Sequence, residues 1–412
     1  MVNRLRALDL TDYRGWLAGK ILAETGCEVI KIEKPGGDPG RRLGPYYQGD
    51  SDPQKSLLWF AYNTSKKGIT LDIEKADGRE LFKRLANTAD FVLESFPPGY
   101  LDKTGLGFSA LSKTNPGIIL TSITPFGQNG PYRDFKEAHI VILALSGLMN
   151  ILGDPDRPPV QTGFPLVYAQ ASGQAATATM IAYYARERDG KGQHVDVSMH
   201  NSGAMWCINA VPLWHLMGGK IGRAGQHREG RTIGGANPRY IWPCQDGFVS
   251  FTVGGGPVYT KSLQLLINWM TAEGMTDDFL KSRDWTSFDM ATVTEEGLRR
   301  VEEPIIKFFL ARKKAELSEE SLKRGIMLFP VVTISELAES PQLKERNFWA
   351  EIDHQELNTT IRYPGFFAQT SNLPCHVKHR APLTGEHNKE IYQLELGLTE
   401  KRLRVLRRTG VI

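Results

Sequence analysis

The chain has 412 residues, of which 41% are hydrophobic and 23% are charged, as is usual for a globular protein. Its 50 basic and 46 acidic residues give a net charge of +4, and this small excess, spread along the chain, argues against a general nucleic-acid binder. No apolar run is long enough for a membrane span or a signal peptide, and the four cysteines form no CxxC pair. We therefore expect a cytoplasmic protein with free thiols and with neither a nucleic-acid nor a membrane partner.

The first third of the chain alternates predicted strands and helices. Strands are expected at residues 6–10, 28–33, 91–95 and 118–124, and helices at residues 15–25 and 78–88. This order is typical of an α/β fold with a parallel, doubly wound sheet. No GxGxxG fingerprint follows the first strand, which weighs against a nicotinamide or flavin enzyme, and the Walker phosphate loop is also absent.

A helix rich in small residues lies near the middle of the sequence. Residues 170–186 are almost all Ala, Ser, Thr, Gly, Met, Ile and Tyr, which predicts a helix whose backbone packs closely against a sheet. The turn DGKGQ ends this helix, and alternating residues predict a strand at 194–198. Residues 201–218 are expected to be helical. No carboxylate occurs between Asp156 and Glu187.

The second half of the chain changes in composition. Residues 221–239 are basic and rich in glycine, which predicts a linker after a large domain at residues 1–220. A smaller α+β domain is expected at residues 240–330, and segment 331–412 follows it. Within these parts we predict strands at residues 240–244, 248–253 and 330–333 and near Ile361 and Phe366, and helices at residues 257–324 and 399–408.

Basic side chains near strand ends favour an anion site. Lys34 follows a predicted strand, Lys103 follows the turn after another, and Lys66 and Lys67 precede a third. Ligands of open parallel sheets bind outside the carboxyl ends of the strands. Cations that converge there would suit a ligand with a diphosphate and a further phosphate, whereas solvated lysines are the alternative.

Other candidate motifs have weaker support. His376 and His379 lie in a loop that contains proline, and no cluster of His, Cys or Asp has metal-ligand spacing, so we expect no metal site. No GxSxG motif supports a hydrolase. His139 begins an apolar run, HIVILALSG, where a structural histidine and one that faces a ligand are both open.

Several motifs in one order resemble the family III CoA-transferases. They cover nearly the whole chain and read RALDLTDYRGWLAGKILAETGCEVIKIEKPGGDPGR, NTSKKGITLD, ADFVLESFPPGYLDKTGLGF, NPGIILTSITPFGQNGPY, GKGQHVDVSM, ISELAESPQL and APLTGEHNKEI. The resemblance implies a Rossmann-like large domain built from both ends of the chain, a small domain between them, and two subunits interlocked like links of a chain. Segment 331–412 would then return to complete the large domain.

The resemblance also implies a site for coenzyme A, bound as a thioester substrate and not as a tightly held cofactor. The positions that match the family's contacts are Tyr13, Arg14, Lys34, Leu71, Asp72, Ile73, Glu74, Ser95, Phe96, Pro97, Lys103, Lys136, Glu137 and His139. Lys34 and Lys103 are also among the strand-end cations. His139 stands where the family usually has Asp or Glu, which is a departure from the pattern.

The family's nucleophile is missing from this sequence. In the family, an aspartate at the end of a GxPxxD turn attacks the acyl-CoA thioester and forms a mixed anhydride, a step that requires a carboxylate. Aligning Gly163 and Pro165 with that turn puts Tyr168 at the aspartate position, or Ala169 if one gap is allowed. We therefore assign no catalytic residue to this chain.

Three hypotheses follow from the missing nucleophile. The first is a non-catalytic subunit, structural or regulatory, that pairs with a homologous catalytic subunit and moves CoA from an acyl-CoA, with succinyl-CoA as the expected donor, to a carboxylic acid, with benzylsuccinate as a candidate acceptor. The second is a self-sufficient acyl-CoA racemase, isomerase or lyase, and the third is a CoA-binding homologue without turnover. The sequence leaves open whether the loop at Gly234 and Gly235 covers the chain's own site or a partner's.

Overall fold

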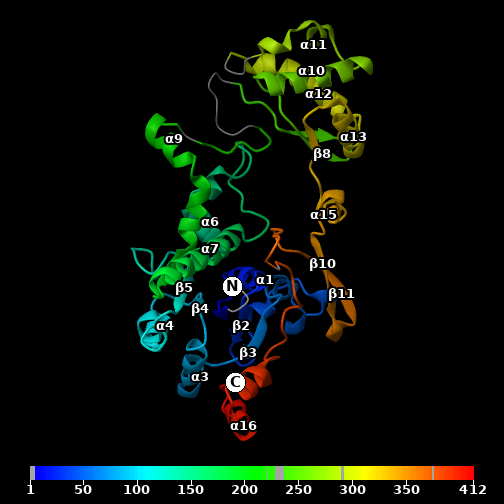
Figure 1. Ribbon diagram of the computed structural model, residues 1–412. Coiled ribbons are helices and arrows are strands. Elements are labelled where there is room, and N and C mark those ends of the chain that lie inside the picture. Colours follow the sequence, from blue (N-terminus) through cyan, green and yellow to red (C-terminus); the bar gives the residue numbers. More distant parts are fainter. Residues whose placement is uncertain (1–4, 220, 228–235, 289–291, 374) are drawn as a thin grey trace. The chain divides into compact units, whose positions relative to one another are not determined.

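The computed structural model describes residues 5–219, 221–227, 236–288, 292–373 and 375–412, so the loop at Gly234 and Gly235 and part of the predicted linker lie outside the described residues (Figure 1). The chain forms two compact units. The first comprises Met1–Gly147, Thr162–Cys207 and Pro341–Ile412, and the second comprises Leu148–Gln161 and Ile208–Ser340.

The first unit is built on a parallel sheet, which confirms the predicted α/β class. Its strands, in the spatial order β3-β2-β1-β4-β5-β6, are β1 (Arg6–Leu10), β2 (Glu28–Glu33), β3 (Lys67–Thr70), β4 (Phe91–Glu94), β5 (Ile119–Thr124) and β6 (His194–Ser198). Leu8 of β1 lies opposite Ile30 of β2 on one side and Val92 of β4 on the other. The strand order reverses at β1, which makes the carboxyl end of β1 the switch point where ligands of such sheets bind.

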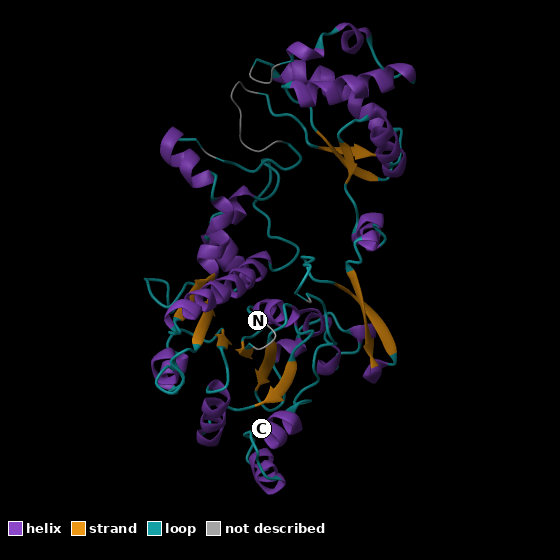
Figure 2. Cartoon of the chain, in the orientation of Figure 1, coloured by secondary structure: helices purple, strands orange, loops and turns teal. Residues whose placement is uncertain are grey.

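Helices of the first unit alternate with its strands along the sequence, as the colouring of Figure 1 shows, and Figure 2 distinguishes the helices from the strands. They are α1 (Trp16–Glu24), α2 (Leu57–Tyr62), α3 (Ala76–Ala86), α4 (Tyr100–Lys103), α5 (Phe108–Leu111), α6 (His139–Leu145), α7 (Leu166–Asp189), α8 (Met199–Ala204), α15 (Pro341–Glu345) and α16 (Glu400–Arg408), with a π-helix, η9, at Lys389–Glu395. Short 3₁₀ turns lie at Pro39–Arg42, Tyr47–Gly49, Pro53–Lys55, Met205–Cys207 and Gln355–Leu357.

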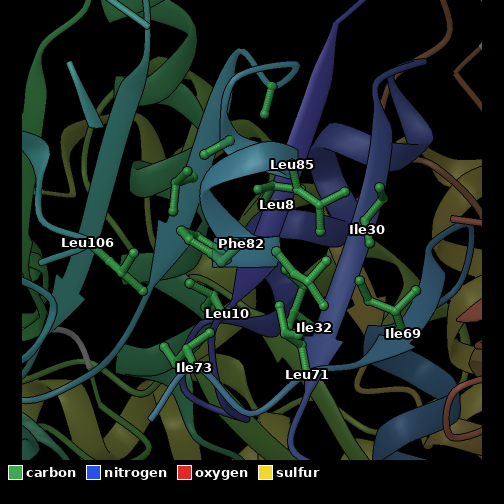
Figure 3. Packing of buried hydrophobic residues seen from close by; sticks show 14 of the residues in the cluster. Leu8, Leu10, Ile30, Ile32, Ile69, Leu71, Ile73, Phe82, Leu85 and Leu106 are labelled. Atoms are coloured by element: carbon green, nitrogen blue, oxygen red, sulfur yellow. The ribbon is translucent and has the colours of Figure 1, made fainter. Parts of the chain in front are cut away.

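Apolar side chains fill the space between the sheet and α3. Leu8 and Ile30 are fully buried against Phe82 and Leu85 of α3, which Figure 3 shows at close range. The end of the chain joins the same core, since the Tyr392 hydroxyl donates a 2.7 Å hydrogen bond to the Thr70 carbonyl oxygen. Burying such side chains stabilises the fold by about 1.5–3 kcal/mol each.

Helix α7 explains why the middle of the sequence is rich in small residues. It packs against α1, β5 and β6, and Ala171 and Ala175 have no exposed surface. The Thr179 hydroxyl lies 2.7 Å from the Thr121 hydroxyl of β5, a distance that larger side chains would not allow. The helix ends at Gly190, whose φ of 72° lies in the left-handed region that favours glycine.

The second unit pairs an antiparallel sheet with helices. The strands are β7 (Ile241–Cys244), β8 (Gly247–Phe251) and β9 (Leu328–Pro330), and the helices are α9 (Ala210–Met217), α10 (Pro257–Ala272), α11 (Asp278–Ser282), α12 (Glu295–Leu310), α13 (Lys314–Arg324) and α14 (Ile334–Ala338), with 3₁₀ turns at Leu148–Ile151 and Trp285–Ser287. Its own core contains Trp242, Phe251, Trp269 and Phe308. Among the described helices of both units, none is long and apolar enough to cross a bilayer.

Three predicted elements differ from the structure. The helix expected at residues 201–218 is broken into α8, a 3₁₀ turn and α9, because Pro212 has no N–H to continue a helix from the preceding turn. The strand expected at 330–333 ends at Pro330, because Thr333 instead caps α14 by accepting a hydrogen bond from the Glu336 amide.

The third difference lies in the hairpin of the tail. Strands β10 (Trp349–His354) and β11 (Thr359–Pro364) pair in antiparallel fashion, so Ile361 lies in a strand and Phe366 does not. Strand β11 ends at Pro364, which lacks an N–H, and the Gly365 amide adds one last hydrogen bond to the Phe348 carbonyl in the same register. Strand β10 was not predicted, because its sequence WAEIDH mixes apolar and charged residues.

Candidate functional site

The carboxyl edge of the parallel sheet collects most of the predicted contacts. Tyr13 and Arg14 follow β1, Lys34 follows β2, residues 71–74 follow β3 and residues 95–97 follow β4. Because the strands are parallel, these loops lie at one edge of the sheet, on both sides of the switch point. The structure therefore brings together side chains that are far apart in sequence.

Tyr168, at the predicted nucleophile position, is buried and bonded to a carboxylate. It lies in the first turn of α7 with 4% of its surface exposed. Its hydroxyl donates a 2.7 Å hydrogen bond to Oε2 of Glu137, a residue from the loop before α6. Burial, together with the Glu137 carboxylate, raises the pKa of Tyr168 well above its ordinary value, so the phenol stays protonated.

Arg14 fixes the other oxygen of the same carboxylate. Its guanidinium donates to Oε1 of Glu137 at 3.0 Å, to both oxygens of Asp12, and to the Ser95 carbonyl oxygen at 2.9 Å. Ser95 also donates from its hydroxyl to Asp12. Arg14 is predicted to contact CoA, but here the donors of its half-buried guanidinium are directed to groups of the chain itself.

Two aromatic rings complete the surroundings of Tyr168. Tyr13 and His139 meet its ring edge to face, with centroids 5.8 Å and 5.1 Å away. The Val167 amide at the start of α7 points to His139 Nε2 at 3.4 Å, and burial lowers the pKa of His139. A neutral His139 thus packs on Tyr168 and accepts a hydrogen bond from the Val167 amide at the start of α7.

The side chains of the β3 loop divide between the core and the surface. Leu71 and Ile73 are buried in the hydrophobic core, so any ligand contact there would come from the backbone. Asp72 accepts a hydrogen bond from the Glu74 amide and holds the turn. Glu74 itself is exposed and binds Lys34, with 2.9 Å between Nζ and Oε1.

The remaining predicted contacts are accessible. Phe96 stacks on Tyr100, with ring centroids 4.5 Å apart, and Pro97 is exposed beside it. Lys103 and Lys136 are also exposed, and neither has an ion-pair partner among the described residues. These two lysines keep their charge available for an anion. Ala169, the alternative nucleophile position, is half-buried and carries no reactive group.

The structure separates Lys66 and Lys67 from the other strand-end cations. Lys66 is fully buried and donates to Asp9 at 2.8 Å, and burial lowers its pKa to about 8. Lys67 pairs with Glu28 and Glu390 at the start of β3. Both lysines therefore serve ion pairs within the fold, because Lys66 precedes β3 and Lys67 begins it, while the ligand edge lies at the other end of the strand.

Sequence reasoning missed one buried acid beneath the site. Glu94, the last residue of β4, accepts a 2.7 Å hydrogen bond from the Phe96 amide, and burial raises its pKa to about 7. It lines a small hollow of about 140 Å³ together with Ser122 and His194, which are hydrogen-bonded to each other at 2.9 Å. The only sequence signal was a carboxylate that ends the apolar run FVLE.

Outside this edge, the described residues form a larger hollow but no metal centre. Within the described ranges, no group of three or more His, Cys, Asp or Glu side chains could hold a metal ion. A larger hollow of about 900 Å³ lies in the second unit, lined by Arg157, His227 and Tyr240 among others, and none of the predicted CoA contacts lines it.

Comparisons with known proteins identify the family of the chain. The model of the CoA-transferase family III matches residues 3–388. The succinyl-CoA:(R)-benzylsuccinate CoA-transferase subunit BbsE of Thauera aromatica is 34% identical over 100% of this chain and 98% of its own length. The beta subunit of succinyl-CoA–L-malate CoA-transferase of Chloroflexus aurantiacus is 26% identical, over 95% of this chain and 93% of its own.

A solved structure extends the comparison to the fold. The crystal structure of a CAIB/BAIF family protein from Brucella suis superposes with a TM-score of 0.78 at 26% identity, over 95% of this chain and 98% of that one. The sequence match covers almost the entire chain, and the fold agrees over the same extent. The chain therefore belongs to CoA-transferase family III.

Proposed function

We propose that the chain is the non-catalytic subunit of a heteromeric CoA-transferase and that a homologous partner supplies the nucleophilic carboxylate. The observation that carries this proposal is the buried pair of Tyr168 and Glu137. A protonated phenol cannot form the mixed anhydride, because that species requires a carboxylate oxygen to attack the thioester carbon. Tyr168 therefore fills the nucleophile position without supplying its chemistry.

The names of the similar proteins support both the assembly and the donor. The benzylsuccinate and malate relatives are each named as a subunit, and both names contain succinyl-CoA as a substrate. We infer that this chain works beside a homologous subunit with succinyl-CoA as the donor. Benzylsuccinate is the first acceptor to test, with L-malate as the comparison.

The binding half of the site supports retention of the CoA ester. Lys103 and Lys136 remain accessible cations, and Phe96 with Tyr100 offers a stacked aromatic surface. Phosphates and a purine are the chemical groups that such side chains bind. The chain could thus hold or orient a CoA ester while the partner performs the transfer.

Glu137 supports a second candidate, a self-sufficient enzyme. It is the carboxylate that the fold brings to Tyr168, although it comes from another segment of the chain. Its side chain is only 6% exposed and is bonded to both Arg14 and Tyr168, which stabilises the carboxylate and reduces its nucleophilicity. We rank this candidate second for that reason.

The two candidates differ in where an acyl group becomes attached. The chain is expressed alone and together with a homologous subunit that carries the aspartate, and each preparation is incubated with succinyl-CoA and (R)-benzylsuccinate. We expect transfer only from the pair, with a hydroxylamine-sensitive acyl adduct on the partner by mass spectrometry. Turnover by the lone chain with an adduct on Glu137 would overturn the first proposal in favour of the second.

A further inference from the structure

Three side chains form a bridge over the switch point of the sheet. The Glu74 carboxylate binds Lys34 at 2.9 Å and accepts a hydrogen bond of 2.9 Å from the Tyr100 hydroxyl. Lys34 and Glu74 follow β2 and β3, whereas Tyr100 follows β4. Since β1 lies between β2 and β4 in the sheet, the bridge joins loops on opposite sides of β1.

We propose that Glu74 is an internal competitor for the phosphate groups of the CoA ester, held over the site by Tyr100, and that this bridge lowers the affinity of the chain for CoA. The inference rests on the proposed CoA site, and it concerns the control of binding and not the transfer step. Glu74 would occupy Lys34 in the free chain and leave it when a phosphate binds.

The charges at the bridge support competition. A phosphate that approaches Lys34 meets the Glu74 carboxylate, and two like charges repel at that distance. Lys34 and Tyr100 both hold Glu74 in its ionised form and so lower its pKa. The carboxylate thus offsets part of the attraction that Lys34 alone would offer to an anion.

The bridge is also built so that it can open. The side chains of Lys34 and Glu74 are 54% and 53% exposed, and exposed ion pairs are weak, so a phosphate can displace the carboxylate. The Glu74 backbone is fixed by Asp72 and by Arg79, which donates to the Glu74 carbonyl oxygen at 2.6 Å. Opening therefore requires only a rotation of the Glu74 side chain.

Two conservative variants of the full chain test the bridge by titration calorimetry with CoA. Glu74→Gln removes the competing charge, and we expect CoA to bind about 3- to 10-fold more tightly. Tyr100→Phe removes the hydroxyl and keeps the ring that stacks on Phe96, and we expect binding about 2- to 3-fold tighter. Glu80→Gln, an exposed residue of α3 that pairs with Lys83, is the matched control and should change nothing.

The nature of the ligand separates the possible outcomes. The gain should be present with CoA, shrink as salt is raised, and be absent with pantetheine, which has no phosphates. Unchanged or weaker binding of CoA to Glu74→Gln would overturn the proposal, as would an equal gain with pantetheine. If the heteromeric complex transfers CoA while Glu74→Gln binds CoA no more tightly than the parent, the bridge proposal is overturned and the proposed function stands. If Glu74→Gln binds CoA more tightly but no pairing of subunits transfers CoA, the proposed function is overturned and the bridge stands.

Discussion

The side chain at position 168 carries the proposal that this chain is a non-catalytic subunit. A carboxylate there would be a nucleophile, while the Tyr168 phenol is kept protonated by burial and by the neighbouring Glu137. The charge of the Glu137 carboxylate is paired, because Arg14 donates to one of its oxygens and Tyr168 donates to the other. The polar atoms around Tyr168 are therefore paired, although residue 168 itself has no carboxylate.

The Tyr168 hydroxyl should contribute to stability through Glu137. In Tyr168→Phe, the buried Glu137 carboxylate keeps its hydrogen bond from Arg14 but loses the one from the Tyr168 hydroxyl. We expect this loss to lower the free energy of unfolding by about 1–2 kcal/mol. Urea unfolding of the variant and the parent measures this difference. Tyr184→Phe on the same helix is the control, because Tyr184 is 71% exposed, and equal losses in the two variants would contradict the argument.

Glu94 should make stability depend on pH near neutrality. Its pKa is about 7 in the folded chain and about 4.5 when unfolded, so the folded state holds the proton more tightly between these values. The free energy of unfolding should fall by roughly 2–3 kcal/mol as pH rises from about 4.5 to about 7.5, and Glu94→Gln should remove that fall.

Denaturant unfolding at several pH values provides the measurement for Glu94. Glu80→Gln, which alters an exposed carboxylate, should keep the pH dependence of the parent chain. Curves for the parent and Glu94→Gln that run parallel across this pH range would show that the buried carboxyl does not titrate there.

At the scale of elements, α7 determines how closely the polypeptide layers approach. Its alanines at 171 and 175 are completely buried, and the helix lies against α1 and β5. A helix with small residues on such a face brings its first turn, and thus Tyr168, up to the loops that follow β1 and precede α6. The composition of the helix and the position of the site are therefore linked.

A larger side chain inside α7 should destabilise the first unit. Ala175→Leu forces extra methylene and methyl groups into a filled space, and we expect a loss of about 1–3 kcal/mol, measured by thermal or urea unfolding. Thr177→Leu, two residues further along and exposed, should cost less than about 0.5 kcal/mol. A similar loss for both variants would mean that the face containing Ala175 is not tightly packed.

For the whole molecule, exposed apolar side chains around α9 are consistent with a protein partner. Trp214 and Leu216 are 63% and 78% exposed, and Trp206 and Val211 are also exposed. Large apolar groups gathered in one stretch are typical of surfaces that another subunit covers. This observation supports a covering protein subunit, which the heteromeric proposal requires.

Leu216→Glu should weaken association with the homologous partner. A charge placed in a covered apolar surface loses hydration, so we expect about 10-fold weaker association by analytical ultracentrifugation of the co-expressed pair. Leu322→Glu on α13, at a residue 70% exposed, is the matched control and should leave association unchanged. Equal effects of the two substitutions would argue against a partner at α9.

Local sequence patterns were sufficient to predict those elements that have a regular pattern of apolar residues or a distinctive composition. Alternation placed β1, β2 and β6 at their observed bounds, and composition found α7, because these segments have a regular apolar pattern bounded by turns. Prediction was weaker at residues 330–333 and at β10. There, a helix cap and cross-strand pairing decide the conformation, and both depend on residues elsewhere in the chain.

By itself, the sequence determined the α/β class, the family, and the absence of a carboxylate between Asp156 and Glu187. Only the tertiary structure decided which side chains surround Tyr168, which lies within that stretch. Glu137 reaches Tyr168 from a segment 31 residues away, and Glu74 meets Tyr100 over β1. Spacing along a chain does not give such distances, because parallel strands bring loops together at one edge of the sheet irrespective of their separation in sequence.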